Sequence, residues 1–145
     1  DENDVQTILS HPDSMVGSDS MSLATEGLLA KTSTHPRAFG TQAKVLGEFV
    51  REKKCFSLEE GVKKLTYNPA KILKIEGRGL LKEGNFADIV IFNPDTIKDM
   101  ATYKNPKQYP VGIDTVIVNG VVAFEDGRQL EVLPGRFLKN SFASK

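Results

Sequence analysis

The sequence predicts an α/β chain, with helices in its first half and short strands in its second half. Between Phe39 and Lys53, apolar residues recur at three- and four-residue steps, which is the spacing of an amphipathic helix. After Lys74 the pattern changes to short apolar runs such as 87–92. A later run is interrupted by Asn119-Gly120, the pair that supplies the positive φ angles of a type I′ hairpin turn. We therefore expect helices followed by a sheet with at least one hairpin.

The first 38 residues predict one short helix and a long loop. Asp4 to Leu9 can form one or two helical turns, which end at His11-Pro12 because the residue before a proline disfavours the helical region. Met15-Val16 is too short for more than a buried strand or an extended segment. Residues 20–38 lack periodicity, so we expect an irregular loop, and loops of that length are usually functional or disordered.

Two further helices are expected before residue 74. Ser57 followed by Glu60 is a capping box, in which Ser57 accepts a hydrogen bond from the third helical amide while Glu60 reaches back to the cap. This helix should continue to residue 66. Asn68-Pro69 predicts a third short helix that ends near Leu73, with Asn68 as its N-cap and Pro69 at its first helical position.

The β half is defined by one apolar run and two turns. The run 87–92, which is apolar around Asp88, is typical of a strand that is covered on both faces. Asn119-Gly120 should lie at a hairpin tip, and 125–127 should form a second turn. One sheet-based core is expected to bury the apolar residues Ile89, Ile91, Phe92, Val116 and Val118.

Composition and charge exclude several partner classes. The chain has 19 basic and 19 acidic residues, and they are spread evenly along it, so nucleic acid and a membrane surface are not expected partners. Its apolar runs are far shorter than the roughly 20 residues that a membrane span needs. The single cysteine, Cys55, cannot form an internal disulfide, which fits a cytoplasmic protein. The opening Asp1-Glu2-Asn3-Asp4 suggests a cut within a longer polypeptide.

Three side chains are candidates for chemistry, and each has a plainer alternative. Asp19 follows a short apolar stretch; such an Asp commonly caps a helix or forms an Asx-turn, but at the end of a barrel strand it can bind metal or move protons. Arg37 offers a planar fork for carboxylates, and His35 could bind metal or donate a hydrogen bond. The alternative for both is a surface loop with incidental charges. With two histidines and one cysteine, no spacing matches a zinc site.

Two sets of motifs resemble the amidohydrolase superfamily over nearly the whole chain, from about Asp4 to Leu138. One set is similar to many cyclic amidohydrolases, dihydroorotases and hydantoinases included: Leu65-Thr66, Asn68-Pro69-Ala70, Gly79-Leu80, Gly84 and Ala87-Asp88-Ile89-Val90. The other set more specifically resembles the N-acyl-D-amino-acid deacylases (D-aminoacylases): the stretch from His35 to Thr41, Leu46-Gly47, Val50-Arg51-Glu52, Pro110-Val111-Gly112-Ile113 and Val118-Asn119-Gly120.

The resemblance implies a metal-dependent hydrolase whose (β/α)₈ barrel holds one or two zinc ions, together with a small β-sandwich built from both chain ends. Residues 1–73 would be the C-terminal end of the barrel domain, with Met15 to Ser18 as the eighth strand. Residues 74–145 would be the C-terminal part of the sandwich. A barrel needs about 250 residues, so the remaining ligands should lie upstream in the same polypeptide. The 145 residues alone are therefore expected to be inactive.

The resemblance also implies a role for each candidate. Asp19 would contact the metal site, take a proton from the zinc-bound water and hand it to the leaving amine nitrogen. Arg37 would contact the substrate carboxylate, while Ser18 and His35 would shape the mouth of the site. Ser20 stands where the family usually has glycine, which leaves the fine substrate preference open.

The expected function is hydrolysis of linear amide bonds in N-acyl-D-amino acids by a zinc enzyme. Its expected partners are that substrate, the upstream part of the same polypeptide and, as an open alternative, a second copy in a homo-oligomer. One competing hypothesis is a dihydroorotase or hydantoinase, which cleaves a cyclic amide. Another is a non-catalytic module, in which the sandwich half packs against a partner and Asp19 is only a turn residue.

Overall fold

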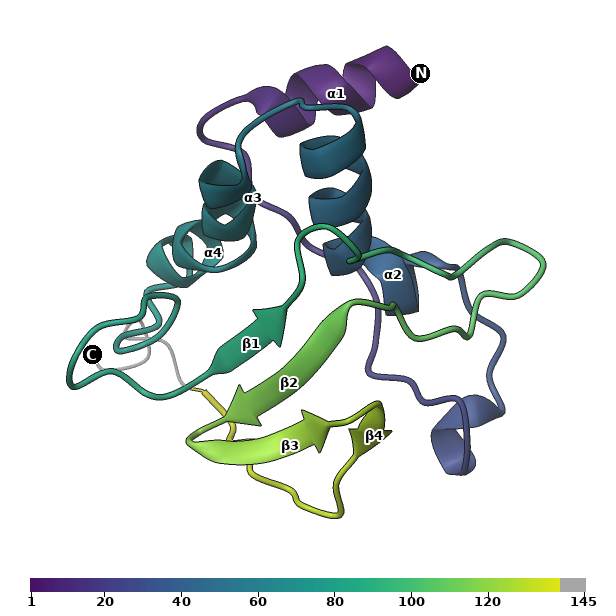
Figure 1. The fold of residues 1–145 in the computed structure, drawn as a ribbon, viewed down its shortest axis with the longest axis vertical. Helices are drawn as coiled ribbons and strands as arrows, with labels where there is room; N and C mark the ends of the chain where they lie inside the picture. The colour runs from purple at the N-terminus through teal and green to yellow at the C-terminus, as the bar shows by residue number, and fades with distance from the viewer. Residues whose placement is uncertain (139–145) are drawn as a thin grey trace.

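A computed structural model describes residues 1–138 of the chain, and Figure 1 shows its longer helices gathered on one side, its sheet on the other, and the short turn at 28–30 apart from the other helices. The expected order of helices followed by strands is confirmed. The helical elements are α1 (Glu2–Ser10), a short 3₁₀ turn η1 (Leu28–Ala30), α2 (Arg37–Lys44), η2 (Val45–Glu52), α3 (Leu58–Leu65) and α4 (Tyr67–Ile72). The strands are β1 (Ile89–Phe92), β2 (Ile113–Val118), β3 (Val121–Glu125) and β4 (Arg128–Gln129). No helix within residues 1–138 is long and apolar enough to span a membrane.

The predicted amphipathic helix beginning near Phe39 is present, but its second half is a π-helix. α2 continues directly into η2, where the Lys53 amide donates to the Glu48 carbonyl five residues earlier, at 2.8 Å. From η2, the Arg51 guanidinium reaches across to the Ile97 carbonyl, at 2.7 Å. That contact joins the helical half to the loop that follows β1.

The two predicted caps of the following helices have different outcomes. Ser57 accepts from the Glu60 amide at 3.2 Å, as expected, but the Glu60 carboxylate pairs with lysines of its own helix instead of reaching back. The prediction for Asn68 is wrong. α4 begins at Tyr67, so Asn68 lies inside the helix, where its side chain donates to the Ser14 carbonyl at 3.4 Å. A tertiary partner has replaced the local cap.

The sheet is antiparallel throughout, in the order β1-β2-β3-β4. The predicted hairpin is confirmed: Val118 pairs with Val121, and Asn119 and Gly120 between them have φ of 49° and 81°. The second turn is also confirmed, with positive φ at Asp126 and Gly127 between β3 and β4.

The core lies where the helices meet the sheet, so the predicted sheet-based core is wrong in its location. Ala43, Leu46 and Ile97 are buried at its centre, and Phe92 and Ile113 pack against them. Ile91 is 49% exposed, and Val90 is 51% exposed. β1 is an edge strand, and within residues 1–138 no second sheet covers it, so this strand is not covered on both faces.

A polar cluster at the hairpin tip holds the turn before β1. The Asp88 carboxylate accepts from the Asn119 amide at 2.8 Å and pairs with Arg78, whose side chain is 9% exposed. Burial raises the pKa of the Asp88 carboxyl, but the Asn119 amide and the Arg78 guanidinium outweigh it, so the pKa lies below its ordinary value. Asp88 therefore acts in this chain as an ionised structural acceptor.

Candidate functional site

Asp19 stands at the end of the extended segment that follows α1, and its carboxylate faces Arg37. The Oδ2 atom of Asp19 lies 3.0 Å from Nη2 of Arg37, and the two side chains are 89% and 49% exposed. Asp19 has φ of 48°, a left-handed conformation that aspartate tolerates better than most residues. Among the described residues, no helix starts directly after it, since the next helical element is η1 at Leu28–Ala30. The structure thus brings together two of the candidate residues, 18 positions apart.

Met15 to Ser18, the segment that leads to Asp19, is extended but belongs to no sheet in the described part of the chain. Of the two alternatives that the sequence left open, the extended segment is observed. The Val16 amide donates to the Lys64 carbonyl at 3.2 Å, which anchors the segment on α3. Ser18 is half-buried beside Asp19.

His35 connects Arg37 to a distant loop. Its Nδ1 atom accepts from the Arg37 amide at 3.1 Å, and its Nε2 atom lies 3.1 Å from the Tyr103 hydroxyl. Because Nδ1 is an acceptor, the neutral ring carries its proton on Nε2, which donates to Tyr103. Both ring nitrogens are therefore engaged, and in this arrangement His35 orients the start of α2 rather than binding a metal.

Sequence reasoning missed the loop 99–110, which follows β1 and packs beside the irregular segment 20–36. Besides the contact of Tyr103 with His35, the Tyr109 ring meets the Phe39 ring edge-on at 5.6 Å, and Lys107 donates to the Ala30 carbonyl. No sequence signal marks these residues, because a tyrosine or lysine in a polar loop looks like any solvated residue.

The described residues supply few side chains that could bind zinc. Residues 1–138 contain no group of three or more His, Cys, Asp or Glu side chains placed to hold a metal ion. A zinc site needs three or four protein ligands, and Asp19 offers one carboxylate. The described residues therefore do not supply a complete set of zinc ligands.

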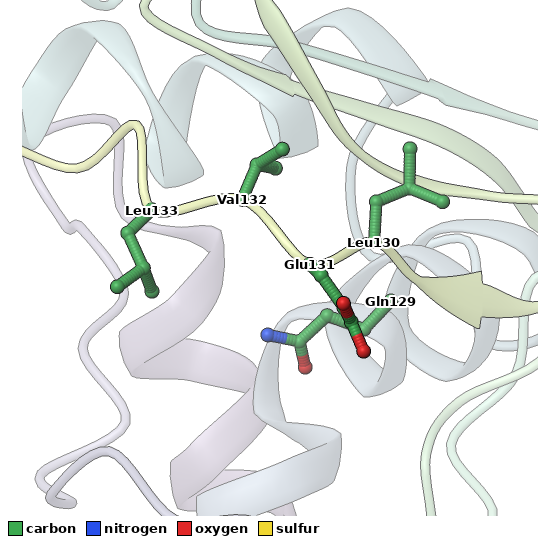
Figure 2. A pocket seen from close by; sticks show the side chains of 5 residues that line it. All are labelled: Gln129, Leu130, Glu131, Val132 and Leu133. Atoms are coloured by element: carbon green, nitrogen blue, oxygen red, sulfur yellow. The ribbon is translucent and has the colours of Figure 1, made fainter.

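Two surface hollows lie away from the candidate residues. Figure 2 shows one that is bordered by five consecutive residues after β3, 129–133, with Leu130 and Val132 on one side of the segment and Gln129 and Glu131 on the other. A second hollow lies between α4 and the turn at Gly79. Asp19, His35 and Arg37 line neither of them, so the candidate site is defined by its polar contacts.

The chain is similar to a known family and to characterised proteins. A family model described as "Amidohydrolase family" matches residues 3–124. The chain belongs to this family. Within this family, the chain is 40% identical to an N-acyl-D-glutamate deacylase of Alcaligenes xylosoxydans xylosoxydans. The 139 aligned residues cover 96% of the chain and 27% of the relative. The chain is 38% identical to a D-aminoacylase of the same organism, over 99% of the chain and 28% of the relative. The chain thus spans little more than a quarter of these relatives.

Solved structures agree. A crystal structure of D-aminoacylase superposes with a TM-score of 0.87 at 38% identity, covering 97% of this amidohydrolase chain and 28% of the other. The structure of an N-acyl-D-glutamate deacylase from Bordetella bronchiseptica, complexed with zinc and a phosphonate inhibitor, superposes with a TM-score of 0.77 at 41% identity. The match covers 88% of this chain and 26% of the other. A dihydroorotase of Endomicrobium trichonymphae is 51% identical, but over 34% of the chain. The predicted resemblance to the D-aminoacylase branch is confirmed.

Proposed function

We propose that these residues are the C-terminal part of a zinc-dependent amidohydrolase that hydrolyses N-acyl-D-amino acids to a carboxylate and a free D-amino acid. The observation that carries the proposal is the match to deacylases of this class over 95% or more of the chain, whereas dihydroorotases match about half of it or less. In this proposal, residues 1–73 close the barrel domain and 74–145 belong to the β-sandwich. Residues 139–145 lie outside the described part.

Asp19 is proposed to move the protons of the reaction. As the attacking water forms its bond to the amide carbon, Asp19 accepts the proton that the water loses. When the carbon–nitrogen bond breaks, Asp19 donates that proton to the leaving nitrogen. Zinc, with ligands supplied mainly outside these residues, would polarise the amide carbonyl and the water. The exposed carboxylate of Asp19 supports this role, because its pair with Arg37 is a surface ion pair worth only about 0–1 kcal/mol and can open.

Arg37 is proposed to bind the α-carboxylate of the substrate, with Ser18 and His35 at the mouth of the site. The His35 ring fixes the backbone of Arg37, while the guanidinium itself is half-exposed. A guanidinium can hold a carboxylate through two parallel hydrogen bonds, which orients the neighbouring amide. The half-buried Cys55 fits a cytoplasmic location. The exposed Val90 and Ile91 of β1 would pack against the upstream part of the same polypeptide or against a second copy in a homo-oligomer.

Arg37→Met in the complete enzyme should lower kcat/KM for N-acetyl-D-amino acids by roughly 10- to 100-fold, chiefly by raising KM. This is the loss expected for a hydrogen bond to a charged group, about 1.5–3 kcal/mol. The matched control is the same substrate with its carboxylate converted to a primary amide, on which the variant and the parent enzyme should differ little. Equal losses on both substrates would show that Arg37 does not read the carboxylate.

The function is tested by assaying the complete enzyme on N-acetyl-D-amino acids, their L-enantiomers and dihydroorotate, with metal content measured on the same preparation. We expect release of the D-amino acid, little turnover of the other substrates, and bound zinc. Turnover of dihydroorotate alone would favour the cyclic amidohydrolase. A zinc-free protein without hydrolytic activity would favour the non-catalytic module.

A further inference from the structure

Lys64 is the charged residue that the described part of the chain buries completely, with 0% of its surface exposed. It lies in the last turn of α3, and its ammonium points at the turn that follows α1. Three acceptors surround the Nζ atom: the His11 carbonyl at 2.6 Å, the Ser14 hydroxyl at 3.0 Å and the Glu60 carboxylate at 3.4 Å. The ammonium donates two hydrogen bonds, to the His11 carbonyl and the Ser14 hydroxyl, and its contact with Glu60 is an ion pair without a hydrogen bond.

These contacts hold the segment that leads to Asp19. Besides the Lys64 ammonium, the Lys64 carbonyl accepts from the Val16 amide, and the Asn68 side chain donates to the Ser14 carbonyl. Val16 is three residues before Asp19, so the last anchored amide is within about 10 Å of the carboxylate-bearing residue along the chain. Beyond Val16, the next tertiary hydrogen bond or ion pair of this segment among the described residues is the Asp19–Arg37 pair itself.

Stability alone explains a buried lysine poorly. Removing an ammonium from water costs several kcal/mol, and an apolar side chain of similar volume often serves a core equally well. A buried cation with two hydrogen bonds to the turn 11–14 and an ion pair within its own helix, in contrast, restricts where that turn can lie. The arrangement of Lys64 therefore suits the orientation of the turn 11–16 more than the filling of space.

We propose that Lys64 is a positioning residue for the reaction, which sets the segment 11–16 so that Asp19 stands within reach of the protons it transfers. This inference rests on the proposed function of Asp19. Lys64 acts through the backbone of this segment and does not touch the substrate.

The test compares Lys64→Met with Lys63→Met in the complete enzyme. Lys63 is the neighbouring lysine and is 46% exposed, and its ammonium pairs with the same Glu60 at 3.3 Å. Per folded molecule, Lys64→Met should lower kcat on the order of 100-fold, the loss that a displacement of about 1 Å can cause, while KM changes little. Lys63→Met should keep kcat within about twofold of the parent, as for surface substitutions.

A second arm repeats Lys64→Met in the Asp19→Asn background. If Lys64 acts by placing Asp19, Lys64→Met should lower the kcat of the Asp19→Asn enzyme by no more than about twofold. A change of that size is within the usual deviation from additivity. A purely structural lysine would reduce kcat by the same factor in both backgrounds, and that result would overturn the inference.

The outcomes separate this inference from the proposed function. Near-normal turnover of Asp19→Asn would overturn both. If Asp19→Asn loses turnover but Lys64→Met and Lys63→Met have the same kcat, only the role of Lys64 would be overturned.

If Lys64→Met does not fold, Asn68→Ala replaces it, because it removes the bond to the Ser14 carbonyl and leaves the ammonium in place. Asn68→Ala should lower the kcat of the parent enzyme about fivefold, the effect of losing one hydrogen bond. It should leave the kcat of the Asp19→Asn enzyme nearly unchanged. An equal fall in the parent enzyme and in Asp19→Asn would overturn the inference.

Discussion

Asp19→Asn in the complete enzyme should lower kcat by at least the roughly 10²- to 10⁴-fold that general acid–base catalysis contributes. Asparagine keeps the size of the side chain and one oxygen, but it cannot accept the proton of the attacking water. Zinc content and melting temperature should change much less, because the other ligands are untouched. Measuring kcat, bound zinc and melting temperature on one preparation checks all three.

The competing role for Asp19, a turn residue alone, predicts the opposite order of effects. The free energy of unfolding would fall by about 0.5–2 kcal/mol, as for a lost cap, while turnover per folded molecule stayed near normal. Asp19→Ala is a useful companion, because it also removes the partner of Arg37. That exposed ion pair contributes little to the free energy of unfolding, so Asp19→Ala should be nearly as stable as Asp19→Asn. Its kcat should be lowered equally. Near-normal turnover of either variant would contradict the catalytic role.

Gly112→Ala should be the most destabilising single-methyl change that we expect in the β half, with a loss of about 2–5 kcal/mol from strain and overpacking together. Gly112 has φ of 82°, where a Cβ atom is strained. That atom would also lie 2.5 Å from the Ile97 nitrogen and 2.6 Å from the Ile97 Cα. Ile97 is 2% exposed at the centre of the core, so the added methyl group must displace a core residue through its backbone.

Gly120→Ala is the matched control for this prediction. Gly120 has nearly the same φ, 81°, but nothing lies within 4 Å of the position a Cβ would take. Both variants thus carry the backbone strain, and the difference between them isolates the steric displacement, which we expect to be about 1–3 kcal/mol. Urea unfolding gives the difference, and hydrogen exchange at the Ile97 amide reports the local effect. Equal losses would show that the loop before β2 yields without disturbing the core.

Parts of the candidate site could be predicted from the sequence, and parts could not. Asp19 and Arg37 stand out as a carboxylate after an apolar stretch and a guanidinium in a loop, but no local pattern shows that they meet at 3.0 Å. Tyr103 and Lys64 carry no signal at all. A lysine within a charged helix such as 58–65 normally faces solvent, and only the turn 11–14 folded over α3 makes its burial evident.

The sequence by itself determined the features that depend on local geometry. Asn119-Gly120 forms its turn because few residue pairs accept two positive φ angles, and Ser57 caps α3 because its hydroxyl reaches an amide three residues away. The tertiary structure decided the features that depend on distant neighbours: Asn68 bonds to Ser14 instead of capping a helix, and Ile91 of β1 lies half-exposed. Burial and long-range hydrogen bonds are settled by which segments pack together, and that choice is not encoded in any one of them.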